Sequence, residues 1–549
     1  MAAYTKVFML IVLNFHCVFG NSQLPLQDDF HGAKPTRGEP WPLPQSYTPS
    51  AETFSLNYLS FEFRVTGSTC DTLTAAIRRY EELIFGERSK IDNRLKFFSG
   101  SQRFSSADGS VNSLSVHVQE ACDTTENKYP ALESNEAYNL TVASPDSQLV
   151  SNTVWGAMRG LETFSQLIYE GLDGQFEMNK TVIQDFPRFK YRGLLLDSSR
   201  HFLSVDILKK NLDAMAYNKF NVFHWHIVDD QSFPYESVLF PEMSAMGSYF
   251  GLSHTYTQAN IKDVVEYARL RGIRVIPEFD TPGHTQSWGK AIQNLLTKCY
   301  TSGKPNGNFG PIDPSVNSTY DFLKKFFGEV AEVFPDHYIH LGGDEVSFSC
   351  WQSNPQITDF MKKMSFGSNY AQLEQYYMQN LLSIINSLNK GYLIWQEVID
   401  NGATVRPDTI VEVWKGGYQK ELAKVTKLGY HALLSSCWYL NLIAYGSDWK
   451  RYYACDPWDM VNGTQQQLDL VIGGEACMWG EYVDNTNVIS RTWPRAAAVG
   501  ERLWSNKDVR DGTKAAPRMA EHRCRLISRG FQAEPINGPD FCEHEYRGV

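Results

Sequence analysis

From about residue 189 onward, the sequence alternates short apolar runs with longer segments of helical periodicity. The runs are rich in β-branched and aromatic residues, as expected of strands that are buried on both faces. There are eight of them: Tyr191–Leu196, Asn221–Val228, Arg274–Phe279, Tyr338–Leu341, Tyr392–Trp395, Thr409–Trp414, His431–Ser435 and Leu470–Gly474. Eight strands that alternate with helices are typical of a (β/α)8 barrel. We therefore predict an α/β chain in which residues 188–549 form a TIM barrel.

The region before the predicted barrel has a different pattern. Strand-like alternation occurs in Leu56–Val65 and Ser113–Gln119, and helical spacing occurs in Thr72–Phe85 and Thr153–Tyr169. A smaller α+β domain over residues 21–187 is therefore predicted. Its first part, residues 21–50, is rich in proline, and we expect an extended lead-in there rather than a packed element.

Residues 1–20 have the features of a secretory signal peptide. Lys6 precedes an apolar stretch from Val7 to Phe19, and Val18 and Gly20 occupy the small-residue positions of a cleavage site. The apolar stretch is shorter than the ~20 residues that span a bilayer, so a membrane anchor is the weaker interpretation. Since no later stretch is apolar over that length, we predict no membrane span.

Charge and motif content exclude two function classes. Lys+Arg 51 against Asp+Glu 62 gives a net charge of −11, which repels phosphate backbones and anionic membranes. Nucleic acid is therefore not an expected partner. The sequence also has no P-loop and no GxGxxG after a predicted strand, so a nucleotide cofactor is not supported.

Ten cysteines occur, and nine remain once Cys17 is removed with the signal peptide. They form no CxxC pair and no zinc-like spacing, so structural disulfides are a better interpretation than metal ligation. The odd number means at least one free thiol. Four glycosylation sequons agree with a secretory route, and they begin at Asn139, Asn179, Asn317 and Asn462.

Polar and aromatic residues follow the predicted strands, which is where the active site of a TIM barrel lies. They are Asp197 and Arg200, Asp229 and Asp230, Asp280 and His284, Asp344 and Glu345, Gln396 and Glu397, Trp414, Trp438 to Asn441, and Glu475 with Trp479 and Glu481. Helix capping would explain one or two of the acids, but not the tryptophans. Because indole rings pack on the apolar face of a sugar while charged groups bind its hydroxyls, a glycoside hydrolase is the leading class.

The strongest candidates for catalytic acids are Asp344 and Glu345, which are adjacent at the end of the fourth predicted strand. Both can reach one ligand where the strand ends and the pleat relaxes. A solvated loop is the alternative interpretation. Gly342 and Gly343 allow close backbone approach at this point and favour a site.

Other chemistries fit the sequence less well. His224 and His226 form an HxH pair, but the histidines and the strand-end lysine that would complete a two-metal site are missing, so we expect hydrogen-bonded barrel residues and no metal. Ser-His-Asp catalysis lacks a GxSxG motif. A secreted glycan-binding protein on a catalytically inactive barrel is kept as an alternative, and an ordinary two-carboxylate glucosidase or galactosidase as a third.

Five motifs stand out along the chain, namely Tyr191–His201, His224–Asp230, Pro282–Thr285, His340–Val346 and Gly473–Glu481. They resemble family-20 glycoside hydrolases of the animal lysosomal β-N-acetylhexosaminidase type, and the resemblance covers nearly the whole chain. The resemblance implies an exo-acting enzyme that removes terminal β-linked N-acetylglucosamine or N-acetylgalactosamine. It also implies retention of configuration by substrate-assisted catalysis, in which the acetamido oxygen is the nucleophile, and no cofactor.

The same resemblance implies residue roles. Glu345 would be the general acid and then the general base, and Asp344 would orient the acetamido group and stabilise its developing charge. Tyr439 would hydrogen-bond the acetamido oxygen, and Asp229 and His284 would form a relay to Glu345. The residues that would wall or hold the sugar are Trp395, Trp414, Trp479, Arg200, Asn441 and Glu481. Glu397 receives no role.

The resemblance also implies the disulfides Cys70–Cys122, Cys299–Cys350 and Cys524–Cys542, which would leave Cys437, Cys455 and Cys477 unpaired. The expected substrate is an oligosaccharide, glycoprotein or glycolipid, and the expected assembly is a homodimer or a heterodimer with a paralogous subunit. The lysosome is the expected location, with secretion as the alternative. Leu442 follows Asn441 where relatives associated with anionic substrates have arginine, so a neutral aminosugar glycoside is expected.

Overall fold

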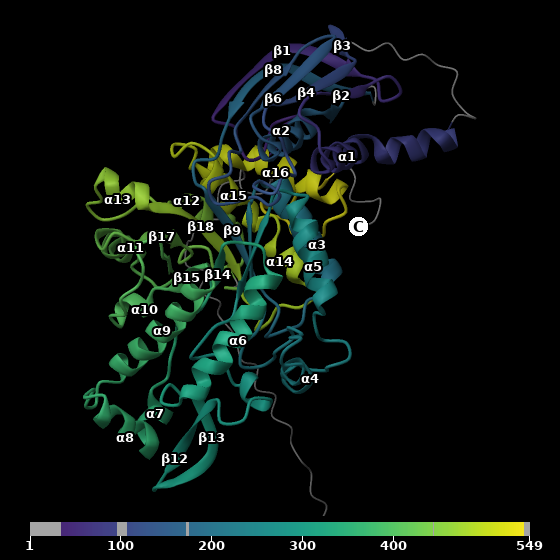
Figure 1. Ribbon diagram of the computed structural model, residues 1–549. Helices are drawn as coiled ribbons and strands as arrows, with labels where there is room; N and C mark the ends of the chain where they lie inside the picture. Colours follow the sequence, from purple (N-terminus) through teal and green to yellow (C-terminus); the bar gives the residue numbers. More distant parts are fainter. Residues whose placement is uncertain (1–33, 96–106, 172–174, 443, 543–549) are drawn as a thin grey trace, which may run out of the picture.

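The computed structural model describes residues 34–95, 107–171, 175–442 and 444–542, and the predicted signal peptide lies outside them. Figure 1 shows a β-sheet at one end of the molecule, a layer of helices beneath it, and a barrel surrounded by helices below that layer. No helix of the described segments is long and apolar enough to cross a membrane.

The N-terminal layer is an eight-stranded sheet with the path β2-β4-β6-β5-β8-β1-β3 and with β7 paired to β8. Its strands are β1 (Ser46–Leu56), β2 (Glu62–Gly67), β3 (Gly109–Val111), β4 (Ser113–Val118), β5 (Tyr138–Val142), β6 (Asp146–Ser151), β7 (Tyr169–Glu170) and β8 (Phe176–Asp185). Helices α1 (Asp71–Leu95) and α2 (Val154–Leu167) lie on the face toward the barrel (Figure 1). Helix α2 begins where the Thr153 hydroxyl accepts a hydrogen bond from the Gly156 N–H.

The second part of the chain is a closed parallel barrel with the strand order β10-β11-β14-β15-β16-β17-β18-β9. Its strands are β9 (Tyr191–Asp197), β10 (Val222–His226), β11 (Arg274–Glu278), β14 (Tyr338–His340), β15 (Gly391–Trp395), β16 (Ile410–Val413), β17 (His431–Leu434) and β18 (Val471–Met478). Each strand overlaps one of the eight predicted runs. The predicted barrel, preceded by a smaller α+β region, is therefore confirmed.

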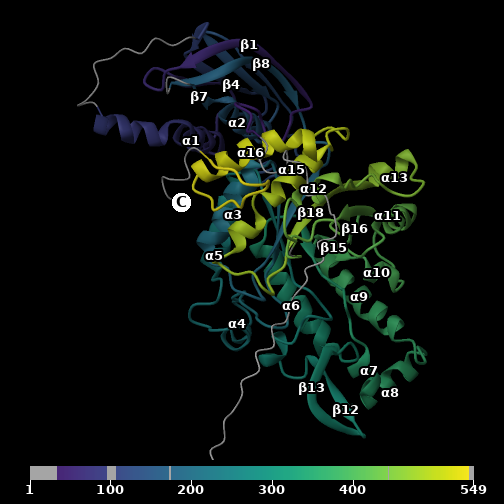
Figure 2. The ribbon, with the colours of Figure 1, turned by 180° about the vertical axis from the view of Figure 1, so that it is seen from behind.

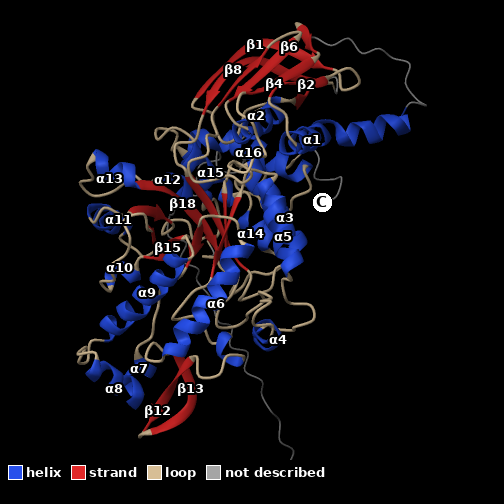
Figure 3. Cartoon of the chain, viewed as in Figure 1, coloured by secondary structure: helices blue, strands red, loops and turns tan. Residues whose placement is uncertain are grey.

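Helices surround the barrel, as Figures 2 and 3 show. The longer ones are α3 (Val205–Tyr217), α5 (Gln258–Arg269), α6 (Asn317–Val333), α8 (Pro355–Lys363), α9 (Tyr370–Ser387), α11 (Tyr418–Lys427), α15 (Arg495–Trp504) and α16 (Gly512–Ser528). The shorter ones are α4 (Glu242–Gly247), α7 (Ser349–Ser353), α10 (Glu397–Asp400), α12 (Trp449–Ala454), α13 (Gln465–Leu470) and α14 (Val488–Thr492). A hairpin of β12 (Leu296–Thr301) and β13 (Lys304–Ile312) extends away from the barrel (Figure 3).

Buried ion pairs fasten the barrel to the N-terminal sheet and helices. Glu136 faces Arg159 of α2 at 2.7 Å and Arg192 of β9 at 2.5 Å, and all three side chains are at most 5% exposed. Nearby, Lys219 Nζ donates to Asp185 at 2.8 Å. Because removing either partner of such a pair leaves an uncompensated buried charge, these contacts fix the two parts against each other.

Two expectations for the N-terminal part are wrong. The stretch Leu56–Val65 is not one strand, because β1 ends at Leu56 and a turn in which the Asn57 carbonyl accepts from the Phe61 N–H separates it from β2. The proline-rich lead-in is packed rather than merely extended. Trp41 is fully buried in the barrel's hydrophobic core, and its Nε1 donates to the Ala497 carbonyl at 2.9 Å.

The cysteines form one more disulfide than expected. The described residues contain Cys70–Cys122, Cys299–Cys350, Cys524–Cys542 and also Cys437–Cys455. The expectation that Cys437 and Cys455 are unpaired is wrong, because the loop after β17 meets the end of α12 with their Cα atoms 6.4 Å apart. In the part of the chain that the structure describes, Cys477 is the free cysteine, and it is buried in β18.

Candidate active site

The acid pair follows β14 in a loop whose backbone requires glycine. Gly342 and Gly343 have φ values of +68° and +95°, and a Cβ at Gly342 would collide with the Asp280 carboxylate. The Gly343 N–H donates to Asp280 Oδ1 at 2.8 Å. This turn buries the Asp344 side chain to 13% exposure, while Glu345, itself at φ +51°, leaves 61% of its side chain open to solvent.

His284 connects the acid pair to a buried carboxylate. Its Nδ1 lies 3.2 Å from Asp229 Oδ1, and its Nε2 lies 3.7 Å from Glu345 Oε2 and 3.9 Å from Asp344 Oδ2. The Asp280 carboxylate is also 3.9 Å from Nε2. One imidazole therefore faces Asp229 on one side and the acid pair on the other.

Burial and neighbouring charges perturb the pKa values of this group. Burial would lower the pKa of His284, but the carboxylates of Asp280, Asp229 and Asp344 raise it to about 11. Burial raises the pKa of Asp344 to about 6. Burial would also raise the pKa of Asp229, but hydrogen bonds from His226 and His284 hold it well below its usual range. Such opposed shifts among neighbouring groups are typical of acid–base sites.

Arg200 follows β9 and lies beside the same group. Its Nη2 is 2.8 Å from Asp229 Oδ2, its Nη1 donates to Asp197 Oδ2 at 3.1 Å, and its guanidinium lies 5.1 Å from the Trp479 ring centroid. Burial would lower the pKa of Arg200, but the carboxylates of Asp197, Asp229 and Glu481 raise it. The Glu481 side chain is exposed.

An aromatic wall lies beside the acids. Ring centroids are 6.1 Å apart for Trp395 and Trp479, 6.2 Å for Tyr439 and Trp479, and 6.1 Å for Trp414 and Tyr439. These four residues come from β15 and from the loops that follow β16, β17 and β18. The Trp479 Nε1 and the Asn441 Oδ1 are buried and have no hydrogen-bond partner among the described residues. The wall therefore consists of indole and phenol rings that pack beside one another.

Two acids near the strand ends have structural partners instead. Glu397 accepts from Trp414 Nε1 at 2.9 Å and faces Lys415 Nζ at 2.7 Å. It therefore holds the indole of Trp414 in place within the aromatic wall. The expectation that Glu475 follows a strand is wrong, because β18 continues to Met478 and places Glu475 inside the barrel. There it accepts from the Tyr191 hydroxyl at 2.9 Å.

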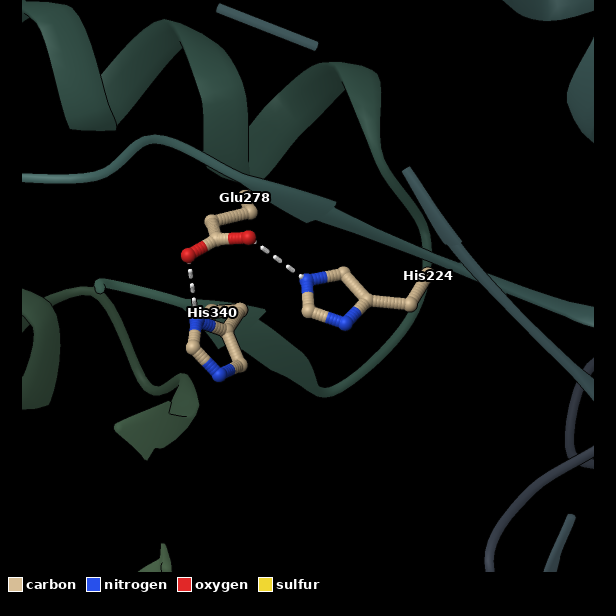
Figure 4. A group of neighbouring side chains, drawn as sticks. All are labelled: His224, Glu278 and His340. Carbon is tan, nitrogen blue, oxygen red and sulfur yellow. Dashed lines mark ion pairs between the residues drawn. The ribbon is translucent and has the colours of Figure 1, made fainter. Parts of the chain in front are cut away.

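The interior of the barrel holds a polar cluster that the sequence did not indicate as a group. Figure 4 shows Glu278 between His224 and His340, at 3.0 Å and 3.2 Å. Glu278, His340 and Glu412 were not singled out as site residues because they lie within strands rather than after them. The signal available in the sequence was the presence of a charged residue within an otherwise apolar predicted strand. Imidazole and carboxylate atoms of this kind can bind metal ions, but here they face one another in pairs.

An acid pair, a charged histidine and an aromatic wall at the carboxyl ends of barrel strands together define the class of a sugar-cleaving barrel enzyme. The family comparison agrees. The model of "Glycosyl hydrolase family 20, catalytic domain" matches residues 189–507, and that of "beta-acetyl hexosaminidase like" matches residues 40–167. The chain therefore belongs to glycosyl hydrolase family 20.

Known proteins similar to the chain agree with this assignment. It is 52% identical to the beta-hexosaminidase subunit beta of Homo sapiens, over 92% of this chain and 90% of that protein. It is 51% identical to the beta-hexosaminidase subunit alpha of Bos taurus, over 92% and 95%. A chitobiase from Flavobacterium johnsoniae superposes with a TM-score of 0.76 at 31% identity, over 89% of this chain and 72% of that one. The predicted family and the predicted class, a glycoside hydrolase of the β-N-acetylhexosaminidase type, are confirmed.

Proposed function

We propose that the protein is an exo-acting, retaining enzyme that removes terminal β-linked N-acetylglucosamine or N-acetylgalactosamine by substrate-assisted catalysis. The observation that carries this proposal is the single imidazole of His284, which faces Asp229 on one side and both Asp344 and Glu345 on the other. Family 20 is an exception to the two-carboxylate rule for glycosidases, since its substrate supplies the nucleophile.

In the first step, the substrate's acetamido oxygen attacks the anomeric carbon while Glu345 protonates the leaving oxygen. The bond to the leaving group breaks and an oxazolinium ion forms. The exposed side chain of Glu345 can then take a proton from water, which opens the oxazolinium ion with overall retention of configuration. No nucleophile from the protein is needed.

Asp344 is suited to hold the acetamido nitrogen. Its Oδ1 is buried and has no hydrogen-bond partner in the described part of the chain, so it can accept from the N–H of the substrate. As positive charge develops on the acetamido group, a carboxylate in this water-poor place stabilises it. Asp344 therefore orients the nucleophile and stabilises the intermediate.

The aromatic wall is suited to the rest of the acetamido group. Trp395, Trp414 and Trp479 provide an apolar surface for its methyl, and the Tyr439 hydroxyl donates to its oxygen. At the sugar's hydroxyls, Arg200, Asn441 and Glu481 supply charged and amide groups. Asp229 and His284 act through Glu345, because the charge of His284 determines how readily Glu345 gives up and regains its proton.

Assembly, location and modification are also part of the proposal. Since the relatives are named alpha and beta subunits, we propose a homodimer or a heterodimer with a paralogous subunit. The predicted signal peptide and sequons support delivery through the secretory route, with the lysosome as destination and secretion as the alternative. The side chains of Asn139, Asn317 and Asn462 are exposed and accessible to glycosylation, whereas Asn179 Nδ2 donates to the Ser50 carbonyl at 2.8 Å.

The test compares hydrolysis of the 4-nitrophenyl β-glycosides of N-acetylglucosamine and of glucose by the wild-type protein at acidic pH. We expect turnover of the first substrate and almost none of the second, because glucose lacks the nucleophile. Glu345→Gln should reduce kcat by about 10²–10⁴-fold. Glu332→Gln, which changes an exposed glutamate of α6, is the matched control. Equal turnover of both substrates would refute the acetamide mechanism, and no turnover by the folded protein would favour a glycan-binding protein.

A further inference from the structure

Carboxylates and imidazoles alternate from the active site into the closed interior of the barrel. Beyond His284 and Asp229, His226 Nε2 lies 2.7 Å from Asp229 Oδ2, and His226 Nδ1 lies 2.6 Å from Glu278 Oε2. His224 Nε2 is 3.0 Å from the same Glu278 oxygen. These groups come from β10, β11 and the loops after them, and those beyond His284 are at most 1% exposed.

The series continues from His224, whose Nδ1 lies 2.7 Å from Glu475 Oε1 of β18. It is therefore continuous across the barrel, with no water-exposed group between Asp229 and Glu475. In a medium of low effective dielectric, neighbouring charges of this kind influence one another strongly.

The geometry at His226 determines its charge. Both ring nitrogens face carboxylate oxygens, but a neutral imidazole carries only one N–H. In the neutral form, one nitrogen lone pair would face a carboxylate without water to separate them. Either His226 is an imidazolium, or one of the two carboxylates holds a proton.

The surroundings of the two carboxylates decide between these states. Glu278 faces the ring nitrogens of His224, His226 and His340 and accepts from Trp395 Nε1 at 2.8 Å, so both of its oxygens are used as acceptors.

Asp229 is surrounded by donors in the same way: it faces Arg200, His226 and His284 and accepts from the Asp230 N–H at 2.6 Å. Both carboxylates are thus held as anions, which leaves the proton on His226.

Other groups around His226 do not reverse this conclusion. Arg200 Nη1 lies 3.3 Å from His226 Nε2 and opposes a positive charge, while the Trp479 ring packs edge-on at 4.9 Å. Burial and Arg200 lower the pKa of His226, but Glu278 and Asp229 outweigh them and raise it to about 9.

We propose that the catalytic relay does not end at Asp229 but continues through His226 to Glu278, and that Glu278 is a positioning residue that keeps His226 charged and Asp229 anionic. This inference rests on the proposed function, because its effect on kcat is exerted through the proton that Glu345 donates to the leaving group. It assigns a function to a buried carboxylate that lies beyond the residues touching substrate.

Loss of the Glu278 charge should shift the pH dependence of kcat in one direction. In Glu278→Gln the side chain keeps its shape but not its charge, so His226 becomes neutral. The positive charge closest to Asp229 is then lost, and the potential at His284 and Glu345 becomes more negative. Both groups hold their protons to higher pH, so the alkaline limb of the kcat–pH profile shifts to higher pH.

The first experiment is the pH profile of kcat and KM for the wild type, Glu278→Gln and Glu412→Gln. For Glu278→Gln we expect kcat to fall about tenfold, KM to stay within about twofold, and the alkaline limb to rise by at least about 0.5 pH unit. Glu412 is the matched control: it is fully buried in β16, lies 3.7 Å from His340 Nε2, and burial holds its pKa well above the usual range. Since Glu412 forms no ion pair with His226, Asp229 or His284 in the described part of the chain, replacing it with glutamine should change neither limb.

A loss of kcat that is equal at every pH in Glu278→Gln, or the same shift in Glu412→Gln, would overturn the proposal. Neutron diffraction of deuterium-exchanged wild-type crystals tests it without turnover and without a variant. We expect deuterons on both ring nitrogens of His226 and none on Glu278. A neutral His226 would overturn the relay even if the hexosaminidase assay succeeds, whereas failure of that assay with a charged His226 would refute only the proposed function.

Discussion

Replacing Asp344 with asparagine should abolish catalysis and at the same time stabilise the fold at neutral pH. The Asp344 side chain is only 13% exposed, and its Oδ1 has no hydrogen-bond partner among the described residues. Burial raises its pKa from 3.8 to about 6. At pH 7 the protein therefore carries a charge that costs free energy in the folded state, and asparagine removes that charge without changing the shape of the side chain.

The magnitude follows from the two pKa values. A difference of about two pH units, at about 1.36 kcal/mol each, corresponds to about 3 kcal/mol in the free energy of unfolding. The folded carboxyl binds its proton more tightly than the unfolded one, so the cost is complete above about pH 6 and absent below 3.8. Asp344→Asn should thus gain up to about 3 kcal/mol at pH 7 and progressively less as the pH falls toward 4.

Urea denaturation followed by tryptophan fluorescence at pH 7 and pH 4 measures this gain. Asp321→Asn removes an exposed carboxylate of α6 and should leave the stability unchanged within about 0.5 kcal/mol at both pH values. If Asp344→Asn is no more stable than the wild type at pH 7, burial of the ionised Asp344 carboxylate does not destabilise the fold. A gain of equal size at both pH values would show that the gain does not depend on the protonation of Asp344.

Three further changes test other parts of the structure. Glu136→Gln leaves the buried Arg192 without a full counter-charge and should lower the free energy of unfolding by about 3–5 kcal/mol, measured by urea denaturation; an effect below about 1 kcal/mol would show that the pair does not hold the two parts together. Replacing both Cys437 and Cys455 by serine opens a loop with a sequence separation of 18 and should cost about 3 kcal/mol, with no change expected if the bond is absent. Arg200→Lys loses the planar fork and should reduce kcat/KM by at least about tenfold without unfolding the protein.

The barrel could be predicted from the sequence because strands buried on both faces appear as continuous apolar runs. All eight runs overlap barrel strands. The N-terminal part was less predictable because its structure depends on contacts between residues that are far apart in the sequence. Trp41 follows a proline and looks like part of a linker, yet it is buried against α15 and accepts a Gln166 side-chain bond on its carbonyl.

From the barrel pattern alone, the site was predictable where its residues follow strands. Asp229, His284, Asp344 and Glu345 do so, and the structure brings them together around one imidazole. Glu278 and Glu475 could not be located in this way, because an acid within a strand looks like an isolated exception until the closed barrel places it opposite a histidine from another strand.

The pairing inside the barrel also explains why such acids can be tolerated there. A single ionised carboxylate at that depth would be strongly unfavourable, and apolar side chains would fill the barrel at lower cost. An alternating series of imidazole and carboxylate groups makes each charge the partner of the next, and the last member, His284, lies beside Asp344 and Glu345. Stability alone does not require this arrangement, since a layer of apolar side chains would fill the same volume. A relay that delivers a defined charge to His284 does require it, so we group Glu278 with the active site rather than with the packing core.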